Sequence, residues 1–193
     1  MNALDLAKRS RGVVTARQAR EAGIPHSRLS ELVAAGDVIR VERGVYCLPE
    51  VWEDEFFIAQ YRFARGVFSD ATALSLHDFT DRTPDHLFMT FPRSYNATAA
   101  REAGITVRTC APEVFDLGVV VVETPSGNSV RAYDLERTLC DLLRGQALPD
   151  LQIVVPAMQA FARFHSGKAS KLMTYARKLG VERKVRGYLE ALL

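Results

Sequence analysis

The 193-residue sequence has only three cysteines and four histidines, two residue types that build many catalytic and metal centres. Its three cysteines, Cys47, Cys110 and Cys140, are far apart and follow no zinc-ligand or disulfide spacing. The four histidines are equally scattered, and no two of the twelve glycines form a Gly-x-Gly pair, so dinucleotide and phosphate-loop motifs are absent. An odd number of unpaired thiols indicates a reducing compartment, and we expect a cytoplasmic protein.

Long apolar runs are missing too. Runs such as Val119–Val122 are far shorter than the roughly 20 residues that a membrane-spanning helix needs. The first residues, MNALDLAKRSRG, lack the apolar core of a signal peptide. We therefore expect a soluble protein with no membrane partner.

Lysine is absent from the whole stretch between Lys8 and Lys168. Metal-dependent nucleases, the alternative that would make this chain an enzyme, commonly place a lysine beside paired carboxylates. The central strands carry no lysine, so such a site cannot be assembled on them. Three neighbouring acids, Asp78, Asp81 and Asp85, fit a solvated loop better than a metal site. The sequence predicts a protein that is not an enzyme and uses no metal or other cofactor.

The formal net charge of +2 hides an uneven distribution. Residues 1–49 hold eight Lys/Arg against five Asp/Glu, residues 50–165 hold ten against sixteen, and residues 166–193 hold seven against two. Two basic ends therefore flank an acidic middle, and the basic N-terminal end fits contact with a polyanion such as DNA. The basic C-terminal segment has two interpretations, a solvated helix face or a second binding surface.

Residues 15–48 are predicted to form two helices and then a β-hairpin. The first helix begins at Thr15, which has the spacing of a capping box with Gln18, and it ends at Gly23-Ile24-Pro25. A second helix follows from residue 26 or 27 with one apolar face. Residues 38–48 then have the pattern of two short strands joined by a turn. This order predicts a winged helix-turn-helix.

In winged helix-turn-helix proteins, the beginning of the second helix enters the major groove and the wing lies beside the DNA backbone. We therefore predict that Arg28 contacts a base or a phosphate, with His26, Ser27 and Ser30 as its neighbours at the beginning of the helix. The other predicted DNA contacts are arginines: Arg17 and Arg20 on the first helix, Arg40 and Arg43 on the wing, and Arg9 and Arg11 on an N-terminal arm. Short helical hairpins with exposed arginines also occur in proteins that bind no nucleic acid. The presence of helix pair, turn and wing in this order favours DNA.

Residues 50–193 are predicted to form a second domain after a winged helix in residues 1–49, which makes the fold class α+β. The second domain is expected to be mixed α/β, with a small sheet and a helical end. Short strands are expected at residues 67–69, 87–91, 105–109, 117–123 and 129–133. The continuous apolar run within residues 117–123 is typical of a strand buried on both faces. Asp134 caps the helical remainder, where Arg137 and Asp141 have the spacing of a helical ion pair.

Several motifs along nearly the whole chain carry a family resemblance. They are RGVY at residues 43–46, SDATALSLH at 69–77, ERTLCDL at 136–142 and KLMTYA at 171–176. In this order and spacing they resemble the AbiEi antitoxins of type IV toxin–antitoxin systems, which act in abortive infection. The resemblance implies a winged helix that binds inverted repeats in its own promoter and represses transcription. It also implies a C-terminal domain that counteracts a nucleotidyltransferase-like toxin.

The partners implied by the resemblance are double-stranded DNA and a cognate toxin. The chain is expected to be a monomer in solution or to pair on DNA, because one winged helix covers only half of an inverted repeat. A stand-alone winged-helix regulator with a sensing C-terminal domain is the alternative. The operator sequence and the mode of toxin neutralisation are open.

Overall fold

The computed structural model describes residues 2–51, 53–144 and 150–192. These residues divide into two compact units. The first unit runs to Arg62 and also includes Glu123–Ser129, and the second holds Phe63–Val122 and the chain from Val130 onward. The domain boundary predicted between residues 49 and 50 stays a prediction; the first compact unit itself continues past that point.

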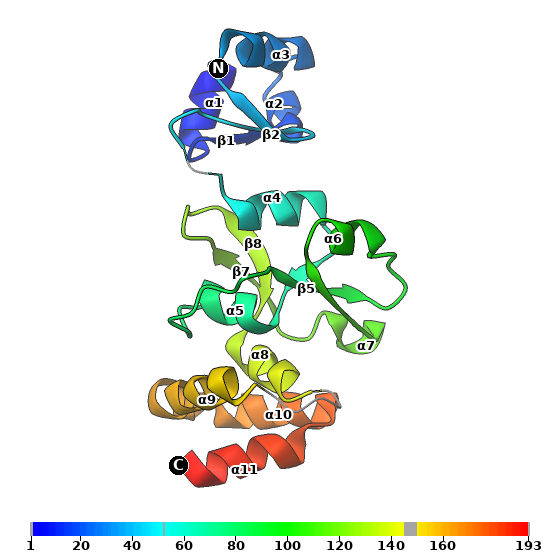
Figure 1. Ribbon diagram of the computed structural model, residues 1–193, viewed down its shortest axis with the longest axis vertical. Helices are drawn as coiled ribbons and strands as arrows, with labels where there is room; N and C mark the ends of the chain where they lie inside the picture. The colour runs from blue at the N-terminus through cyan, green and yellow to red at the C-terminus, as the bar shows by residue number, and fades with distance from the viewer. Residues whose placement is uncertain (1, 52, 145–149, 193) are drawn as a thin grey trace. The chain divides into compact units, whose positions relative to one another are not determined.

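The first unit contains four helices and three strands among its described residues (Figure 1). They follow the order α1 (Ala3–Arg9), β1 (Val13–Thr15), α2 (Ala16–Glu21), α3 (His26–Ala35), β2 (Ile39–Glu42), β3 (Val45–Cys47) and α4 (Glu55–Arg62). The strands form one antiparallel sheet in the order β1-β3-β2. The two helices and the hairpin predicted in residues 15–48 are therefore present, and β1 is a third strand that the sequence pattern did not predict.

Local signals explain where the two central helices begin and end. The hydroxyl of Thr15 accepts from the backbone N–H of Gln18, and the Gln18 side chain accepts from the N–H of Thr15, so the predicted capping box is confirmed. Gly23 has φ +74, a left-handed conformation that glycine adopts without steric cost. Pro25 is the N-cap of α3, and Gly36 ends α3 in the left-handed conformation.

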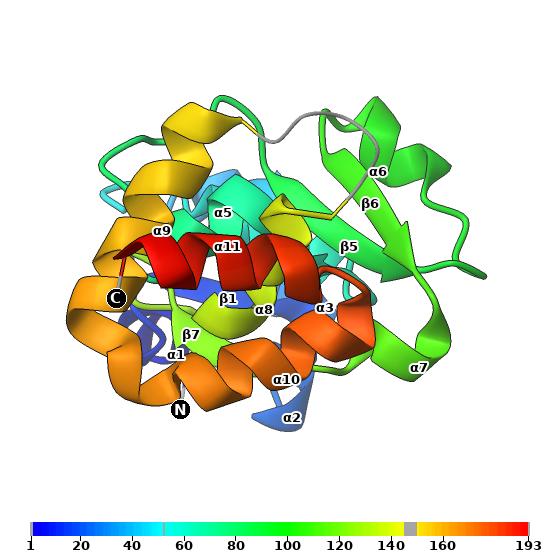
Figure 2. The same cartoon turned by 90° about the horizontal axis from the view of Figure 1, so that it is seen from below.

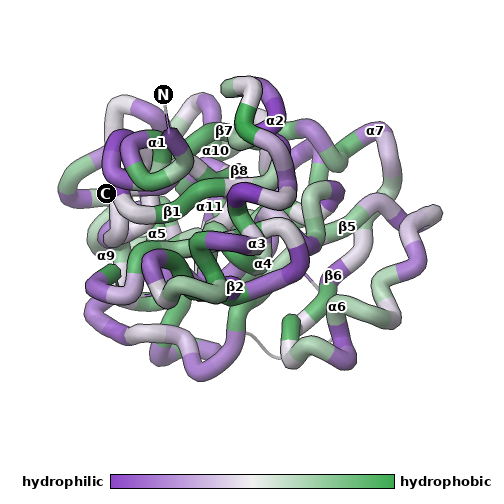
Figure 3. Tube along the Cα trace, turned by 90° about the horizontal axis from the view of Figure 1, so that it is seen from above, coloured by the Kyte–Doolittle hydropathy of each residue, from purple (hydrophilic) through white to green (hydrophobic). Residues whose placement is uncertain are grey.

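The core of the first unit joins α1, α2 and α3 to the sheet. Leu29 and Leu32 of α3 are 1% and 5% exposed, and they belong to the same buried cluster as Val14 of β1 and Tyr46 of β3. Truncating a buried leucine of this kind to alanine costs about 2–5 kcal/mol. In Figure 3 the traces of α2 and α3 carry both hydrophilic and hydrophobic stretches, as amphipathic helices do. The packing fixes which face of α3 meets solvent.

The first residues of the chain differ from the predicted arm. They form α1, with a capping box between Asn2 and Asp5, and Ala3 and Ala7 are buried in the core. Lys8 and Arg9 therefore lie in the last turn of a packed helix. The sequence pattern predicted an arm because residues 8–11 are highly charged. The buried residues of α1 are alanines, which give a helix only a weak apolar pattern.

A turn of the chain at residues 123–129, which belongs to the first unit, is held by a buried carboxylate. Thr124 Oγ1 donates to Asp54 Oδ2 at 2.5 Å, and Asn128 Nδ2 donates to the same oxygen at 2.8 Å. The other oxygen of Asp54 accepts from the N–H of Phe57, in the first turn of α4. Asp54 is 4% exposed, so one buried side chain fixes both α4 and the turn.

The second unit is built on a five-stranded sheet with the order β6-β5-β4-β8-β7. Strands β4 and β5 are antiparallel, whereas β5 pairs with β6 and β4 pairs with β8 in parallel. The elements before the helical end are β4 (Val67–Phe68), α5 (Asp70–Leu76), β5 (Phe88–Pro92), α6 (Thr98–Glu102), β6 (Thr106–Cys110), α7 (Pro112–Phe115), β7 (Val119–Glu123) and β8 (Ser129–Tyr133). The small mixed sheet expected from the sequence is present.

One prediction about this sheet is wrong. The apolar strand β7 is not buried on both faces: Val121 is 70% exposed, and its neighbours in the strand are half-buried or exposed. The reason is the position of β7 at the edge of the sheet, beside β8 alone. A run of valines predicts a strand well, because β-branched side chains favour it, but it does not show whether a second layer covers that strand.

The helical end consists of α8 (Leu135–Leu142), α9 (Leu151–His165), a short 3-10 turn at Ser166–Lys168, α10 (Ala169–Leu179) and α11 (Glu182–Leu192). In Figure 2, which looks at the chain from below, α11 lies in front of α8; α9 and α10 pack against α8, and α11 packs against α9 and α10. Their shared core includes Leu139, Met158, Phe161 and Leu172, each no more than 1% exposed. Within the described ranges, no helix is long and apolar enough to cross a membrane.

The predicted pair of Arg137 and Asp141 is confirmed, and it is fully buried. Arg137 Nε donates to Asp141 Oδ2 at 2.8 Å, and the two side chains are 0% and 1% exposed. Arg137 also donates to the carbonyls of Val114 and Leu117, and its guanidinium lies 4.2 Å from the centre of the Tyr133 ring. The pair therefore ties α8 to the segment around α7.

Candidate nucleic-acid interface

Helix α3 presents a polar face opposite its buried leucines. Ser27, Ser30 and Glu31 have the i, i+3, i+4 spacing of one helical face, and all three are exposed. Leu29 and Leu32 occupy the opposite side. The face centred on Ser27 is therefore free of the core and open to a ligand.

Arg28 lies at the border of this face and is ion-paired. Its Nη1 lies 2.6 Å from Glu31 Oε2, and its side chain is 55% exposed. The pair is local, three residues apart on one helix, so its net free energy is small and an external acceptor can replace Glu31. The predicted contact of Arg28 with a base or a phosphate stays a prediction, and it requires that Arg28 exchange Glu31 for that acceptor.

The beginning of α3 leaves backbone donors without a side-chain cap. Its N-cap is Pro25, which makes no side-chain cap hydrogen bond. His26 Nε2 lies 3.5 Å from the Tyr46 hydroxyl, and Ser30 Oγ donates to the His26 carbonyl at 3.4 Å. Free N–H groups at the positive end of a helix favour an anion such as phosphate. His26, Ser27 and Ser30 are thus brought together at the end of α3 that carries this charge.

The arginines of α2 differ in their partners. Arg17 pairs with Glu21 at 2.8 Å, and the hydrogen bond to that carboxylate raises the pKa of the guanidinium above its ordinary value. Arg20 is exposed in the last turn of α2 and has no ion-pair partner among the described residues. Arg20 therefore offers the more readily accessible charge of the two.

The β2–β3 hairpin carries Arg40 and Arg43. Both are exposed, and neither has an ion-pair partner in the described part of the chain. The register shifts between Arg40 and Glu42, an irregularity that bends the strand before the turn. Gly44 closes the turn at φ +81, where a side chain would also collide with the Tyr61 hydroxyl. The hairpin therefore presents two exposed positive charges, one on β2 at Arg40 and one in the turn at Arg43.

The N-terminal arginines do not lie on a free arm, and their predicted contact with DNA stays a prediction. Arg9 lies in α1, and Arg11 lies in the turn before β1 with φ +56. Arg11 donates to the carbonyl of Gly127 and lies 3.5 Å from the carboxylate of Glu123. Both partners are far away in the sequence, so the sequence around Arg11 could not predict them. Arg11 is thus engaged by the turn between β7 and β8.

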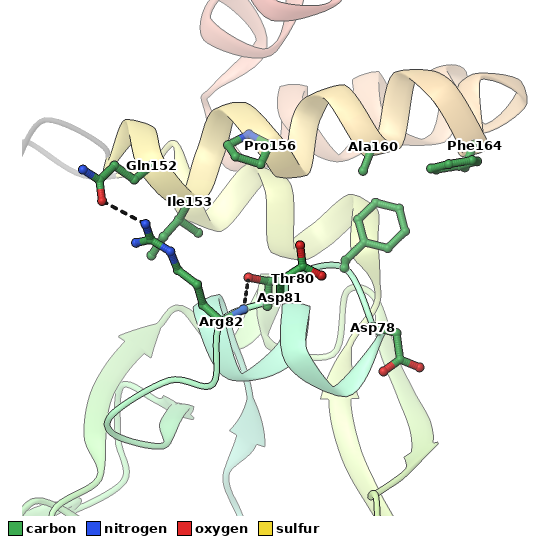
Figure 4. A pocket seen from close by; sticks show the side chains of 10 residues that line it. Asp78, Thr80, Asp81, Arg82, Gln152, Ile153, Pro156, Ala160 and Phe164 are labelled. Carbon is green, nitrogen blue, oxygen red and sulfur yellow. Dashed lines mark hydrogen bonds between the residues drawn. The ribbon is translucent and has the colours of Figure 1, made fainter.

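A cavity of about 450 Å³ lies in the second unit (Figure 4). The loop after α5 supplies Asp78 and Asp81, and α9 supplies Pro156, Ala160 and Phe164. No histidine, cysteine or lysine occurs among the described residues that line it. Across the described ranges, no group of three or more histidine, cysteine or acidic side chains could hold a metal ion.

Two residues outside these sites have structural roles. A ring nitrogen of His77 lies 2.8 Å from the carbonyl of Tyr133, which fits a packing residue with a satisfied hydrogen bond. Cys140 is fully buried in the helical core, and this burial raises its pKa to about 12. A thiol with so high a pKa is a poor nucleophile near neutral pH.

The first unit thus combines a helix pair that has an open polar face with a hairpin that carries two exposed arginines. Residues 2–49 match the family model described as "Transcriptional regulator, AbiEi antitoxin". The match confirms the family resemblance for this part of the chain and indicates a DNA-binding transcriptional regulator.

Two further comparisons concern the whole chain. No curated protein matches it. The fold is similar to the crystal structure of the RV2827C protein from Mycobacterium tuberculosis, with a TM-score of 0.57 and 16% sequence identity over 98% of this chain and 80% of that one. At this identity the similarity concerns the fold alone.

Proposed function

We propose that the first unit is a winged helix-turn-helix in which α3 is the recognition helix and the β2–β3 hairpin is the wing. The observation that carries this assignment is the combination of the open Ser27 face with the uncompensated Arg40 and Arg43. Arg28 reads a base or a phosphate, and Ser27, Ser30 and His26 contact the DNA at the beginning of the helix. Arg17, Arg20 and Arg9 bind phosphates.

On this proposal the protein represses its own promoter by binding inverted repeats. Two copies bind half-sites about one helical turn of DNA apart, because each half of an inverted repeat is bound by one recognition helix. Protection of the DNA upstream of its own gene from nuclease digestion tests this: we expect two protected half-sites at that spacing. Uniform protection, equal on unrelated DNA, would contradict a sequence-specific repressor.

We further propose that the second half counteracts a nucleotidyltransferase-like toxin. Support comes from the antitoxin family that residues 2–49 match, and from the motifs at residues 136–142 and 171–176. Co-expression with an adjacent nucleotidyltransferase-like gene should restore growth. The double variant Arg40→Ala, Arg43→Ala is a matched control, which should lose repression and keep the rescue. Absence of rescue by the natural chain favours the alternative, a stand-alone regulator.

A further inference from the structure

Arg11 has an unusual backbone conformation at the end of α1. Its φ of +56 is uncommon for a residue other than glycine. Gly12 follows at φ +85 and packs so closely on Val51 that a side chain at position 12 would collide with it. The chain therefore turns sharply at Arg11 in a tightly packed setting.

The guanidinium of Arg11 is bound by two acceptors on the turn between β7 and β8. Nη1 donates to the carbonyl of Gly127, and Nη2 lies 3.5 Å from Glu123 Oε1. Gly127 has φ +80, and any side chain there would collide with the Arg11 guanidinium. Only a glycine at position 127 admits this contact.

The turn that supplies these acceptors is itself rigidly held. Thr124 and Asn128 both donate to the buried carboxylate of Asp54. Within the turn, the N–H of Gly127 donates to the carbonyl of Thr124 at 2.7 Å, and the N–H of Asn128 donates to Thr124 Oγ1 at 3.1 Å. The backbone of the turn, which includes the Gly127 carbonyl, is therefore held by contacts that do not involve Arg11.

The contact of Arg11 is long-range, unlike the pairs that Arg17 and Arg28 make with glutamates on their own helices. Arg20, Arg40 and Arg43 lack ion-pair partners among the described residues, whereas the charge of Arg11 is compensated from a segment more than one hundred positions away. The side chains of Arg11 and Glu123 are 52% and 68% exposed, and a cavity of about 330 Å³ lies beside them. A phosphate group can therefore reach the guanidinium and compete with Glu123.

We propose that the turn of residues 123–129 attenuates DNA binding by withholding Arg11 from the phosphate backbone. This inference rests on the proposed DNA-binding function and names a regulation of the same surface. A DNA phosphate gains Arg11 only by displacing the Glu123 carboxylate and the Gly127 carbonyl. Exposed ion pairs are weak, so the attenuation amounts to about two- to fivefold in affinity.

The test uses the full chain, a fluorescent duplex of random sequence, and fluorescence anisotropy at several salt concentrations. Glu123→Gln keeps the shape of the side chain and removes its charge. We expect this variant to bind about two- to fivefold more tightly, and its log–log salt slope to steepen by about 0.9, the value for one added phosphate contact. Glu50→Gln is the matched control, since Glu50 is exposed and has no ion pair in the described part of the chain.

A second background separates release of Arg11 from the simple loss of a negative charge. Arg11→Asn removes the guanidinium and tolerates the left-handed backbone, and a melting curve verifies that it folds. In this background Glu123→Gln should give no gain in affinity. A gain that persists there, or a Glu123→Gln variant that binds like Glu50→Gln, overturns the proposal. Binding by the natural chain without any salt dependence overturns the DNA-binding function itself, and the attenuation with it.

Discussion

Removing the negative charge of Asp141 tests how the second unit compensates a buried arginine. The guanidinium of Arg137 is 0% exposed, and Asp141 supplies a carboxylate oxygen 2.8 Å from its Nε. Asp141→Asn keeps the volume of the side chain and leaves the buried charge uncompensated. Breaking a buried ion pair in this way costs about 3–5 kcal/mol. Because the carbonyls of Val114 and Leu117 still accept from Arg137, we expect the lower end, about 3 kcal/mol.

Urea unfolding followed by circular dichroism measures this free energy of unfolding. In thermal unfolding, about 3 kcal/mol corresponds to a Tm lowered by roughly 6–12 °C for a chain of this size. Asp116→Asn is the matched control, since Asp116 is exposed, and it should change the free energy by less than about 0.5 kcal/mol. A loss below about 1 kcal/mol for Asp141→Asn would refute the reasoning, because the carbonyls and the Tyr133 ring would then suffice to compensate Arg137.

Three further predictions concern DNA binding and pH. Arg28→Ala should lose about 1–3 kcal/mol on the cognate duplex and little on random DNA, since a base reader carries sequence preference; equal losses on both refute that role. Arg43→Ala should weaken both duplexes alike and reduce the salt slope by about 0.9; a loss confined to the cognate duplex contradicts a phosphate contact. Burial raises the pKa of Cys140 to about 12, so the thiol ionises at lower pH in the unfolded chain than in the folded one. Stability should therefore fall as pH rises from the ordinary thiol pKa toward 12, by up to about 1.4 kcal/mol per pH unit. Cys140→Ala should flatten this alkaline decline in urea unfolding, and an unchanged decline would show that Cys140 does not cause it.

Local chemistry explains which elements the sequence could predict. Helix α2 and the following turn could be predicted from the sequence, because their signals act over a few residues. These signals are the capping box of Thr15 and Gln18 and the left-handed Gly23. The same holds for the i, i+4 spacing of Arg137 and Asp141. The spacing does not predict that this pair is buried, because its burial depends on the packing of α7 and the sheet against α8.

The features that escaped prediction depend on distant partners. Strand β1 has only three residues, and it is defined by pairing with β3, about thirty positions further along the chain. The signal that could have revealed α1 is the capping box of Asn2 and Asp5, although its alanine-lined face is weakly apolar. The partner of Arg11 comes from a turn that belongs to the other half of the sequence. For the same reason, the sequence alone does not show whether the guanidinium of an arginine is available to bind a DNA phosphate.

We propose that the first unit binds DNA through its positive charge and recognises the DNA sequence through α3. The most direct measurement is the affinity of the full chain for the DNA upstream of its own gene, titrated against salt beside a scrambled duplex of equal composition. With about four phosphates neutralised per protomer, we expect a log–log slope of roughly −3.6 per protomer, together with tighter binding to the upstream DNA at every salt concentration. A slope near zero, or equal affinity for both duplexes, would contradict the account.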